Sequence, residues 1–159
     1  MIERQYINAL RKIHMRLSDH QINWVITGSL GMALQGMDIE VHDIDIQTNR
    51  HGAYEIEGVL SEYIVRPVHD STSERMRSHF GALEVDGIKV EIMGDVQKLL
   101  DGQVWEEPVS IEEHRHWADF EGMHIPVLSL EYEYQAYRKL GRGEKADRIE
   151  KWLREQRPK

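Results

Sequence analysis

Two aspartates alternate with two isoleucines at residues 43–46, in the order Asp43, Ile44, Asp45, Ile46. Alternation of polar and apolar residues is typical of a strand with one buried face. Aspartate is a poor strand former, so two of them in one short strand need an explanation. On a strand, residues i and i+2 point to the same face with Cα atoms about 6.5–7 Å apart. The pattern therefore predicts a sheet that buries the isoleucines and presents two carboxylates side by side.

Two interpretations of this carboxylate pair remain open from the residues alone. Two carboxylates on one face repel each other unless a cation lies between them. Hard oxygen ligands at this separation suit Mg²⁺ or Mn²⁺, including two ions about 3.5–4 Å apart. The alternative is a pair of solvated aspartates on an exposed strand.

Gly28 and Ser29 interrupt the chain between two regular segments. Residues 24–27 read as a buried strand, and residues 30–35 as a short helix. A glycine at such a junction lets backbone N–H groups approach a ligand, and the start of a helix favours negative charge. The junction suits a phosphate, although the glycine-rich P-loop pattern is absent. A turn without a ligand is the alternative.

Glu91 follows the clearest hairpin in the sequence. Asp86-Gly87 is a preferred turn pair, with strands predicted at residues 80–85 and 88–93. Alternation turns Glu91 outward and its apolar neighbours inward, which also describes an ordinary solvated glutamate. If this strand lies beside the strand of Asp45, a third carboxylate could complete a metal site or accept a proton from an attacking hydroxyl. Glu84 is the nearest rival for this position.

The order of predicted elements indicates an α/β or α+β fold, in which helices back a mixed sheet. We expect one domain over residues 1–159, with a helical tail at about 129–155. The end of one strand is predicted at Pro67, the start of a short helix at Asp95, and a helix cap at Ser129. The predicted helices span residues 2–17, 30–35, 52–62, 95–100, 129–140 and 144–154, and the predicted strands residues 24–27, 43–47, 63–66, 80–85, 88–93, 117–120 and 124–128.

Composition narrows the function classes further. The chain has no cysteine, which excludes disulfides, thiolate metal sites and a cysteine nucleophile. No apolar run is long enough to span a membrane, and no secretory signal is present, so we expect a cytoplasmic protein. The net charge of -8 argues against binding to duplex nucleic acid and is compatible with a cationic substrate.

Taken together, these motifs resemble the DNA polymerase β-like nucleotidyltransferase superfamily. That signature is a strand ending in Gly-Ser, a short helix, Asp-x-Asp on the next strand, and a later lone acid on a strand. The matching stretches are residues 27–31, 42–46 and 90–92, and residues 137–147 are similar to the family's C-terminal helices. The resemblance is strongest to compact bacterial members, either lincosamide and aminoglycoside nucleotidyltransferases or minimal antitoxin-type enzymes.

The resemblance implies a metal-dependent mechanism and a set of site residues. Asp43 and Asp45 would hold Mg²⁺ or Mn²⁺ on a nucleoside triphosphate, and Gly28 and Ser29 would contact its phosphates. Glu91 would be a metal ligand, a general base or both. A hydroxyl of the acceptor would attack the α-phosphate, and pyrophosphate would leave.

Other site assignments and the acceptor are less constrained. Arg75, Arg77 and Lys139 are candidates for further contacts with the nucleotide. Asp38 and Glu40 are candidates for attracting a cationic acceptor. We expect a small-molecule acceptor, with aminoglycosides and lincosamides as candidates. The alternatives are an antitoxin-type enzyme that modifies or binds a partner toxin protein, and a nucleotide-binding module without catalysis.

Overall fold

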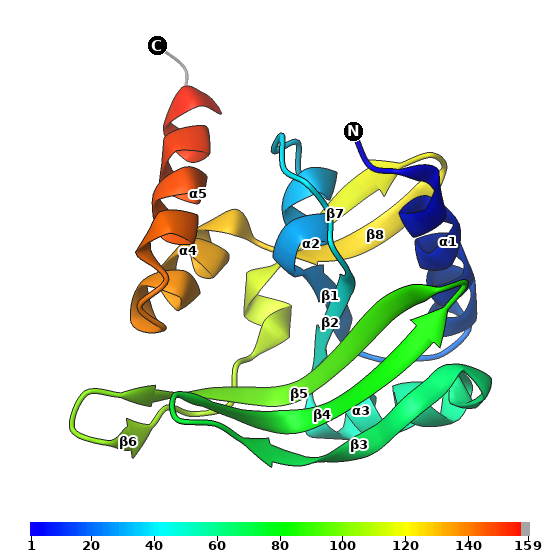
Figure 1. Ribbon diagram of the computed structural model, residues 1–159, viewed down its shortest axis with the longest axis horizontal. Helices are drawn as coiled ribbons and strands as arrows, with labels where there is room; N and C mark the ends of the chain where they lie inside the picture. The colour runs from blue at the N-terminus through cyan, green and yellow to red at the C-terminus, as the bar shows by residue number, and fades with distance from the viewer. Residues whose placement is uncertain (157–159) are drawn as a thin grey trace.

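The computed structural model describes residues 1–156, and the last three residues of the expected 1–159 domain lie outside the described residues. A mixed sheet runs through the protein in the order β3-β4-β5-β2-β1-β8-β7, and β6 pairs with β5 (Figure 1). The predicted α/β class is confirmed. The strands are β1 (Trp24–Thr27), β2 (Ile44–Thr48), β3 (Ile64–Thr72), β4 (Met76–Val85), β5 (Ile88–Leu100), β6 (Val104–Trp105), β7 (Arg115–Phe120) and β8 (Met123–Leu128). The helices are α1 (Arg4–Ser18), α2 (Gly28–Leu34), α3 (Arg50–Val59), α4 (Leu130–Lys139) and α5 (Gly143–Gln156), with 3-10 turns at Ser61–Tyr63 and Ile111–His114.

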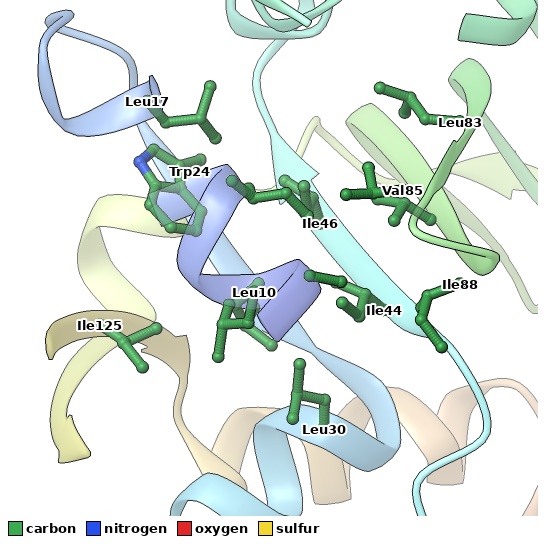
Figure 2. Packing of buried hydrophobic residues seen from close by; sticks show 14 of the residues in the cluster. Leu10, Leu17, Trp24, Leu30, Ile44, Ile46, Leu83, Val85, Ile88 and Ile125 are labelled. Carbon is green, nitrogen blue, oxygen red and sulfur yellow. The ribbon is translucent and has the colours of Figure 1, made fainter. Parts of the chain in front are cut away.

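One face of the sheet carries the main hydrophobic core. Ile44 and Ile46 of β2 are wholly buried there, and they pack with Leu10 of α1 and Val85 of β4 (Figure 2). Burying one such side chain contributes about 1.5–3 kcal/mol. Because the isoleucines face the core, the alternating aspartate of β2, Asp45, faces the opposite side of the sheet.

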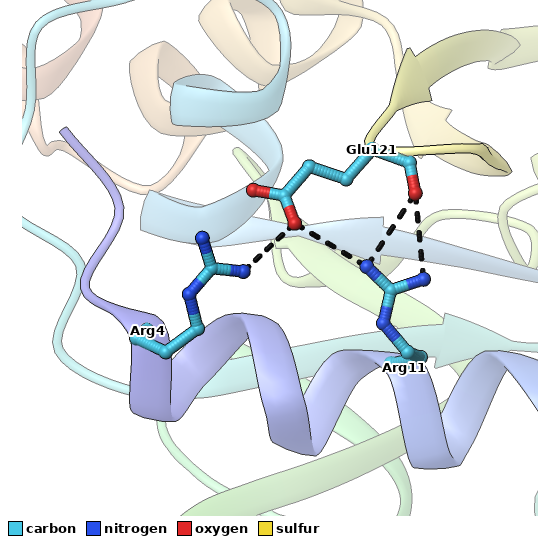
Figure 3. Close-up of polar contacts among 3 residues, drawn as sticks. All are labelled: Arg4, Arg11 and Glu121. Carbon is cyan, nitrogen blue, oxygen red and sulfur yellow. Dashed lines mark hydrogen bonds and ion pairs between the residues drawn. The ribbon is translucent and has the colours of Figure 1, made fainter.

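The first helix is tied to the turn between β7 and β8. Arg4 donates to the Glu121 carboxylate at 2.7 Å, and Arg11 donates to the same carboxylate at 3.3 Å and to the Glu121 carbonyl at 3.4 Å (Figure 3). Glu121 has a positive φ of 47°, which directs its carbonyl and side chain toward α1. Exposed ion pairs contribute little to stability, so α1 is held in place mainly by its buried side chains.

The helix predicted from Asp95 to Leu100 is wrong, because β5 continues through both residues. Asp95 lies in the left-handed region with φ of 50°, inside the shift of the pairing register with β4 that falls between Gly94 and Gln97. Its carboxylate accepts a hydrogen bond from the backbone N–H of Arg50, the first residue of α3, at 2.9 Å. Asp95 therefore caps a helix, as its residue type suggested, but the helix is α3 rather than one of its own.

Two other predicted boundaries move by several residues. Strand β3 does not end at Pro67 but continues to Thr72. Among the described residues it is an edge strand that pairs with β4, so the missing N–H of proline is tolerated, and one of its two register shifts, between Arg66 and His69, spans Pro67. Helix α3 begins two residues before the predicted start at residue 52 and ends at Val59, where a 3-10 turn follows.

The predicted hairpin and the C-terminal helices are confirmed. Asp86 and Gly87 both have positive φ, 52° and 80°, as a two-residue hairpin turn requires. The Ser129 hydroxyl accepts a hydrogen bond from the Tyr132 N–H at 3.2 Å and so caps α4. Helices α4 and α5 pack together beside α2, at the end of the sheet remote from α1 (Figure 1). No helix within residues 1–156 is long and apolar enough to cross a membrane.

Candidate functional site

Three adjacent strands bring the acidic residues together. In the sheet register, Thr27 of β1 lies opposite Asp45 of β2, and Asp45 lies opposite Glu91 of β5. Asp43 immediately precedes β2, and carboxylate oxygens of Asp43, Asp45 and Glu91 all lie within 4.8 Å of one another. The rival Glu84 is exposed on β4 and does not join this group.

The electrostatics of this acidic group fit a hard divalent cation. Burial first, and then the negative charges of Asp43 and Glu91, together raise the pKa of Asp45 from 3.8 to about 7. Lys89 partly compensates, since its ammonium lies 3.2 Å from the Glu91 carboxylate, but its side chain is mostly exposed. The three carboxylates carry like charges that repel one another. A Mg²⁺ or Mn²⁺ ion bound to their oxygens would offset this repulsion.

Gly28 lies in contact range of the acidic group at the end of β1. Its φ is +68°, and a Cβ at this position would lie 2.5 Å from Oδ2 of Asp45. The next residue, Ser29, accepts a hydrogen bond from the backbone N–H of His42 at 3.3 Å, which joins the start of α2 to the segment before β2. Only glycine allows the chain to pass this close to the carboxylate of Asp45.

We expect Gly28→Ala to lower both thermal stability and affinity for Mg²⁺ with a nucleotide. Alanine in the left-handed region costs about 1–2 kcal/mol, and its Cβ would also displace the Asp45 carboxylate. Gly87→Ala is the matched control, because Gly87 also has a positive φ of 80° but has open space around its Cβ position. Calorimetry should show weakened Mg²⁺–nucleotide binding in Gly28→Ala alone. Equal binding by the two variants would contradict a steric role for Gly28.

Glu133 of α4 adjoins the site, and the sequence motifs gave no indication of it. Its side chain is buried, with 4% of its surface exposed. Oε1 accepts hydrogen bonds from the Thr27 hydroxyl and from the Gly28 N–H, the latter at 3.2 Å. Burial raises the pKa of Glu133 to about 7. Glu133 thus connects the C-terminal helices to the end of β1 and the start of α2.

Two cavities flank the acidic group and share Tyr137 as a wall. The first, named here the sheet cavity, has a volume of about 310 Å³ and is largely apolar away from its acidic end. It is lined by residues that include Asp45, Phe80, Glu91, Met93, Lys98, Tyr132, Glu133 and Tyr137. The second, named here the basic cavity, measures about 340 Å³ and is lined by residues that include Ser29, Glu40, His42, Tyr137, Lys145 and Arg148.

An irregularity in β5 and two cations of α5 determine part of the lining of these cavities. The irregularity at Asp95 changes the alternation of β5, so that Lys98 comes to line the same cavity as Glu91. In the basic cavity, Arg148 donates to the carbonyl of Asp38 at 2.7 Å, and the Lys145 ammonium lies 5.4 Å from the centre of the Tyr137 ring. Both cations come from α5. These contacts were not predictable from the local sequence.

The other predicted nucleotide contacts lie apart from these cavities. Arg77 stacks over the Trp105 ring and donates to Gln97 at 3.0 Å, and Lys139 pairs with Glu106 at 3.3 Å. Arg75 and Lys139 line a separate cavity near residues 99–103. In the described chain, none of Arg75, Arg77 and Lys139 lines the sheet cavity or the basic cavity. Their contact with nucleotide stays a prediction.

Comparison with known proteins places this geometry in a known class. A crystal structure of a candidate nucleotidyltransferase from Thermotoga maritima is 56% identical, covers 98% of this chain and 97% of its own, and superposes with a TM-score of 0.87. ANT(2'')-Ia bound to adenylyl-2''-tobramycin shares the fold at 11% identity, with coverage of 92% and 88% and a TM-score of 0.61. LnuA, a lincosamide antibiotic adenylyltransferase bound to lincomycin, does so at 12% identity, with coverage of 94% and 97% and a TM-score of 0.56. No curated protein matches the chain in sequence.

The fold and these relatives define a member of the nucleotidyltransferase superfamily, which confirms the resemblance found in the sequence. The family model described as aminoglycoside-2''-adenylyltransferase matches residues 9–152, which is nearly the whole chain. The chain therefore belongs to the aminoglycoside-2''-adenylyltransferase family.

Proposed function

We propose that residues 1–159 form one metal-dependent nucleotidyltransferase domain that moves a nucleoside monophosphate from a nucleoside triphosphate to a hydroxyl of a small molecule. The observation that carries the proposal is the convergence of Asp43, Asp45 and Glu91 within 4.8 Å, beside Gly28 and Ser29 at the start of α2. Membership of the aminoglycoside-2''-adenylyltransferase family supports ATP as donor and an aminoglycoside as the first acceptor to test.

The three carboxylates are the residues that would hold the metal. A Mg²⁺ or Mn²⁺ ion bound there would stabilise the charge that develops on the entering and leaving oxygens. Glu91 would also accept the proton of the acceptor hydroxyl, as a general base within reach of the reacting group. A bond then forms between the acceptor oxygen and the α-phosphorus, the bond to the bridging oxygen breaks, and pyrophosphate leaves.

The basic cavity is the site that best suits the leaving pyrophosphate. Ser29 and His42 line it next to Asp43, and Lys145 and Arg148 contribute two positive charges from α5. Phosphate oxygens are favoured ligands of lysine and arginine side chains. We therefore assign the β- and γ-phosphates to this cavity and propose Lys145 and Arg148 as nucleotide contacts beside Ser29.

A reconstituted reaction tests this function directly. The protein is incubated with ATP or GTP, Mg²⁺, and tobramycin or lincomycin, and both pyrophosphate and acceptor mass are measured. We expect pyrophosphate release only when triphosphate, metal and an acceptor are all present, together with a gain in acceptor mass equal to one nucleotide. If neither antibiotic class gains mass while a protein encoded beside this one does, the antitoxin-type function replaces the small-molecule function.

A further inference from the structure

Glu133 has one carboxylate oxygen without a partner. Oε1 is satisfied by Thr27 and Gly28, but Oε2 is buried and forms no hydrogen bond within residues 1–156. A buried acceptor that stays unpaired costs about 1–3 kcal/mol, and more when the group is charged. Most buried polar atoms in native proteins are paired, so this oxygen indicates a donor that is supplied from outside the chain.

The cations nearest the sheet cavity do not supply that donor. Lys98 is almost wholly buried, and its ammonium is already bound to the Glu106 carboxylate at 2.7 Å and to the Tyr132 hydroxyl at 3.0 Å. Arg142 lines the cavity from the exposed turn between α4 and α5. Asp45 and Glu91 would be neutralised by the metal that they hold, so Glu133 is the carboxylate of the described lining that is left to complement a positively charged ligand.

The two cavities differ in the ligand that they can accept. In displacement at phosphorus, the entering and leaving oxygens lie roughly in line on opposite sides of the phosphorus. If pyrophosphate leaves toward the basic cavity, the attacking hydroxyl enters from the sheet cavity, where Glu91 lies. The apolar wall formed by Phe80, Met93 and Tyr132 would then receive the carbon skeleton of the acceptor.

We propose that Glu133 is a specificity-determining residue, which accepts a hydrogen bond through Oε2 from an ammonium group of the acceptor in the sheet cavity. This inference rests on the proposed function and adds to it the residue that selects a cationic acceptor. A charged hydrogen bond formed by a desolvated carboxylate is stronger than one between neutral groups. Glu133 would thus distinguish an aminated acceptor from a neutral one that carries the same hydroxyl.

Glu133→Gln separates this role from a structural one. Glutamine keeps one side-chain oxygen for Thr27 and Gly28 but replaces the free oxygen by an NH₂ group, which cannot accept a hydrogen bond. The matched control is Glu131→Gln, which removes an exposed carboxylate two residues earlier on the same helix. The probes are tobramycin, which is polycationic, and trehalose, which is a neutral sugar.

Calorimetry is performed on the full chain loaded with Mg²⁺ and α,β-methylene ATP, which cannot transfer its nucleotide. We expect the native protein to bind tobramycin more tightly than trehalose. Glu133→Gln should weaken tobramycin binding by about tenfold to a hundredfold, while Glu131→Gln leaves it unchanged. The affinity for the ATP analogue should change little in either variant, and neither variant should lower the Tm. In the complete reaction, KM for the acceptor should rise more than kcat falls.

Three results would overturn the proposal. The first is equal tobramycin binding by the native protein and Glu133→Gln. The second is a loss of affinity for the ATP analogue in Glu133→Gln, which would place the nucleobase in the sheet cavity instead. The third is native protein that binds tobramycin no better than trehalose. Failure of the proposed function itself is distinct, because the native protein would then show no Mg²⁺-dependent binding of the ATP analogue.

Discussion

Asp45→Asn is expected to abolish nucleotide transfer while making the metal-free protein more stable. Asp45 lies beside both Asp43 and Glu91, and asparagine replaces its charged carboxylate by a neutral amide oxygen, which is a much weaker ligand for a divalent cation. Metal-ion catalysis contributes several kcal/mol, and each 1.4 kcal/mol is a factor of ten, so turnover should fall by several orders of magnitude. Calorimetry should also show strongly weakened binding of Mg²⁺ with nucleotide.

The gain in stability has the same cause as the loss of function. Without metal, the Asp45 carboxylate is buried and faces two other negative charges, so its folded pKa of about 7 lies above its ordinary value of 3.8. The folded state then holds a proton that the unfolded state has lost, and stability falls as pH rises from about 4 to 7. Asparagine carries no such charge. The variant should therefore match the native protein near pH 4 and exceed it above pH 7.

Thermal unfolding in EDTA at several pH values measures this difference. Each kcal/mol of relieved repulsion should raise Tm by about 2–4 °C in a protein of this size. Asp119→Asn is the control, because Asp119 is a strand aspartate whose side chain is 84% exposed. If Asp45→Asn melts no higher than the native protein at pH 8 in EDTA, the three carboxylates do not repel one another as their spacing indicates. Addition of Mg²⁺ should stabilise only the native protein and the control.

The sequence contained the parts of the acidic group but not their assembly. Alternation alone placed Asp43 and Asp45 on one face and turned Glu91 outward, and these orientations hold in the structure. The approach of Glu91 to Asp45 depends on parallel pairing between β2 and β5, which are separated along the chain by α3, β3 and β4. The periodicity of residues within one segment carries no information on which strands pair or in what register. The expectation that Glu91 joins Asp43 and Asp45 came from the resemblance to nucleotidyltransferases.

Glu133 and Asp95 show why the remainder was not predictable. Glu133 occurs in a helix that the sequence predicted well, but it reads as one of several charged residues on an amphipathic helix. Only the packing of α4 against the end of β1 buries it. At Asp95, helix-capping chemistry was recognised, yet the capped N–H belongs to Arg50 on a distant segment. In both cases the role of the side chain depends on a residue that is distant in the sequence and close only in the folded chain.

Glu91→Gln is expected to remove most turnover while leaving nucleotide binding largely intact. General-base catalysis typically contributes about 10²–10⁴-fold, and glutamine keeps the shape of the side chain but cannot take a proton. Glu84→Gln is a close control, because Glu84 lies opposite Lys89 in the hairpin and Glu91 pairs with the same lysine. Both variants therefore change the surroundings of Lys89, but only Glu91 lies in the acidic group.

Comparison of kcat with nucleotide affinity then decides the role of Glu91. Pyrophosphate release gives kcat, and calorimetry with α,β-methylene ATP and Mg²⁺ gives affinity. A fall in kcat at constant affinity identifies a proton acceptor or a ligand of the metal that faces the acceptor, whereas a parallel loss of affinity identifies a ligand of the metal that holds the triphosphate, because that ligand acts before the chemical step. If turnover survives in Glu91→Gln but is lost in Glu84→Gln, the third carboxylate of the site is Glu84 on β4 and not Glu91. Since the Glu84 carboxylate is exposed and lies outside the acidic group, we expect its replacement to leave kcat unchanged.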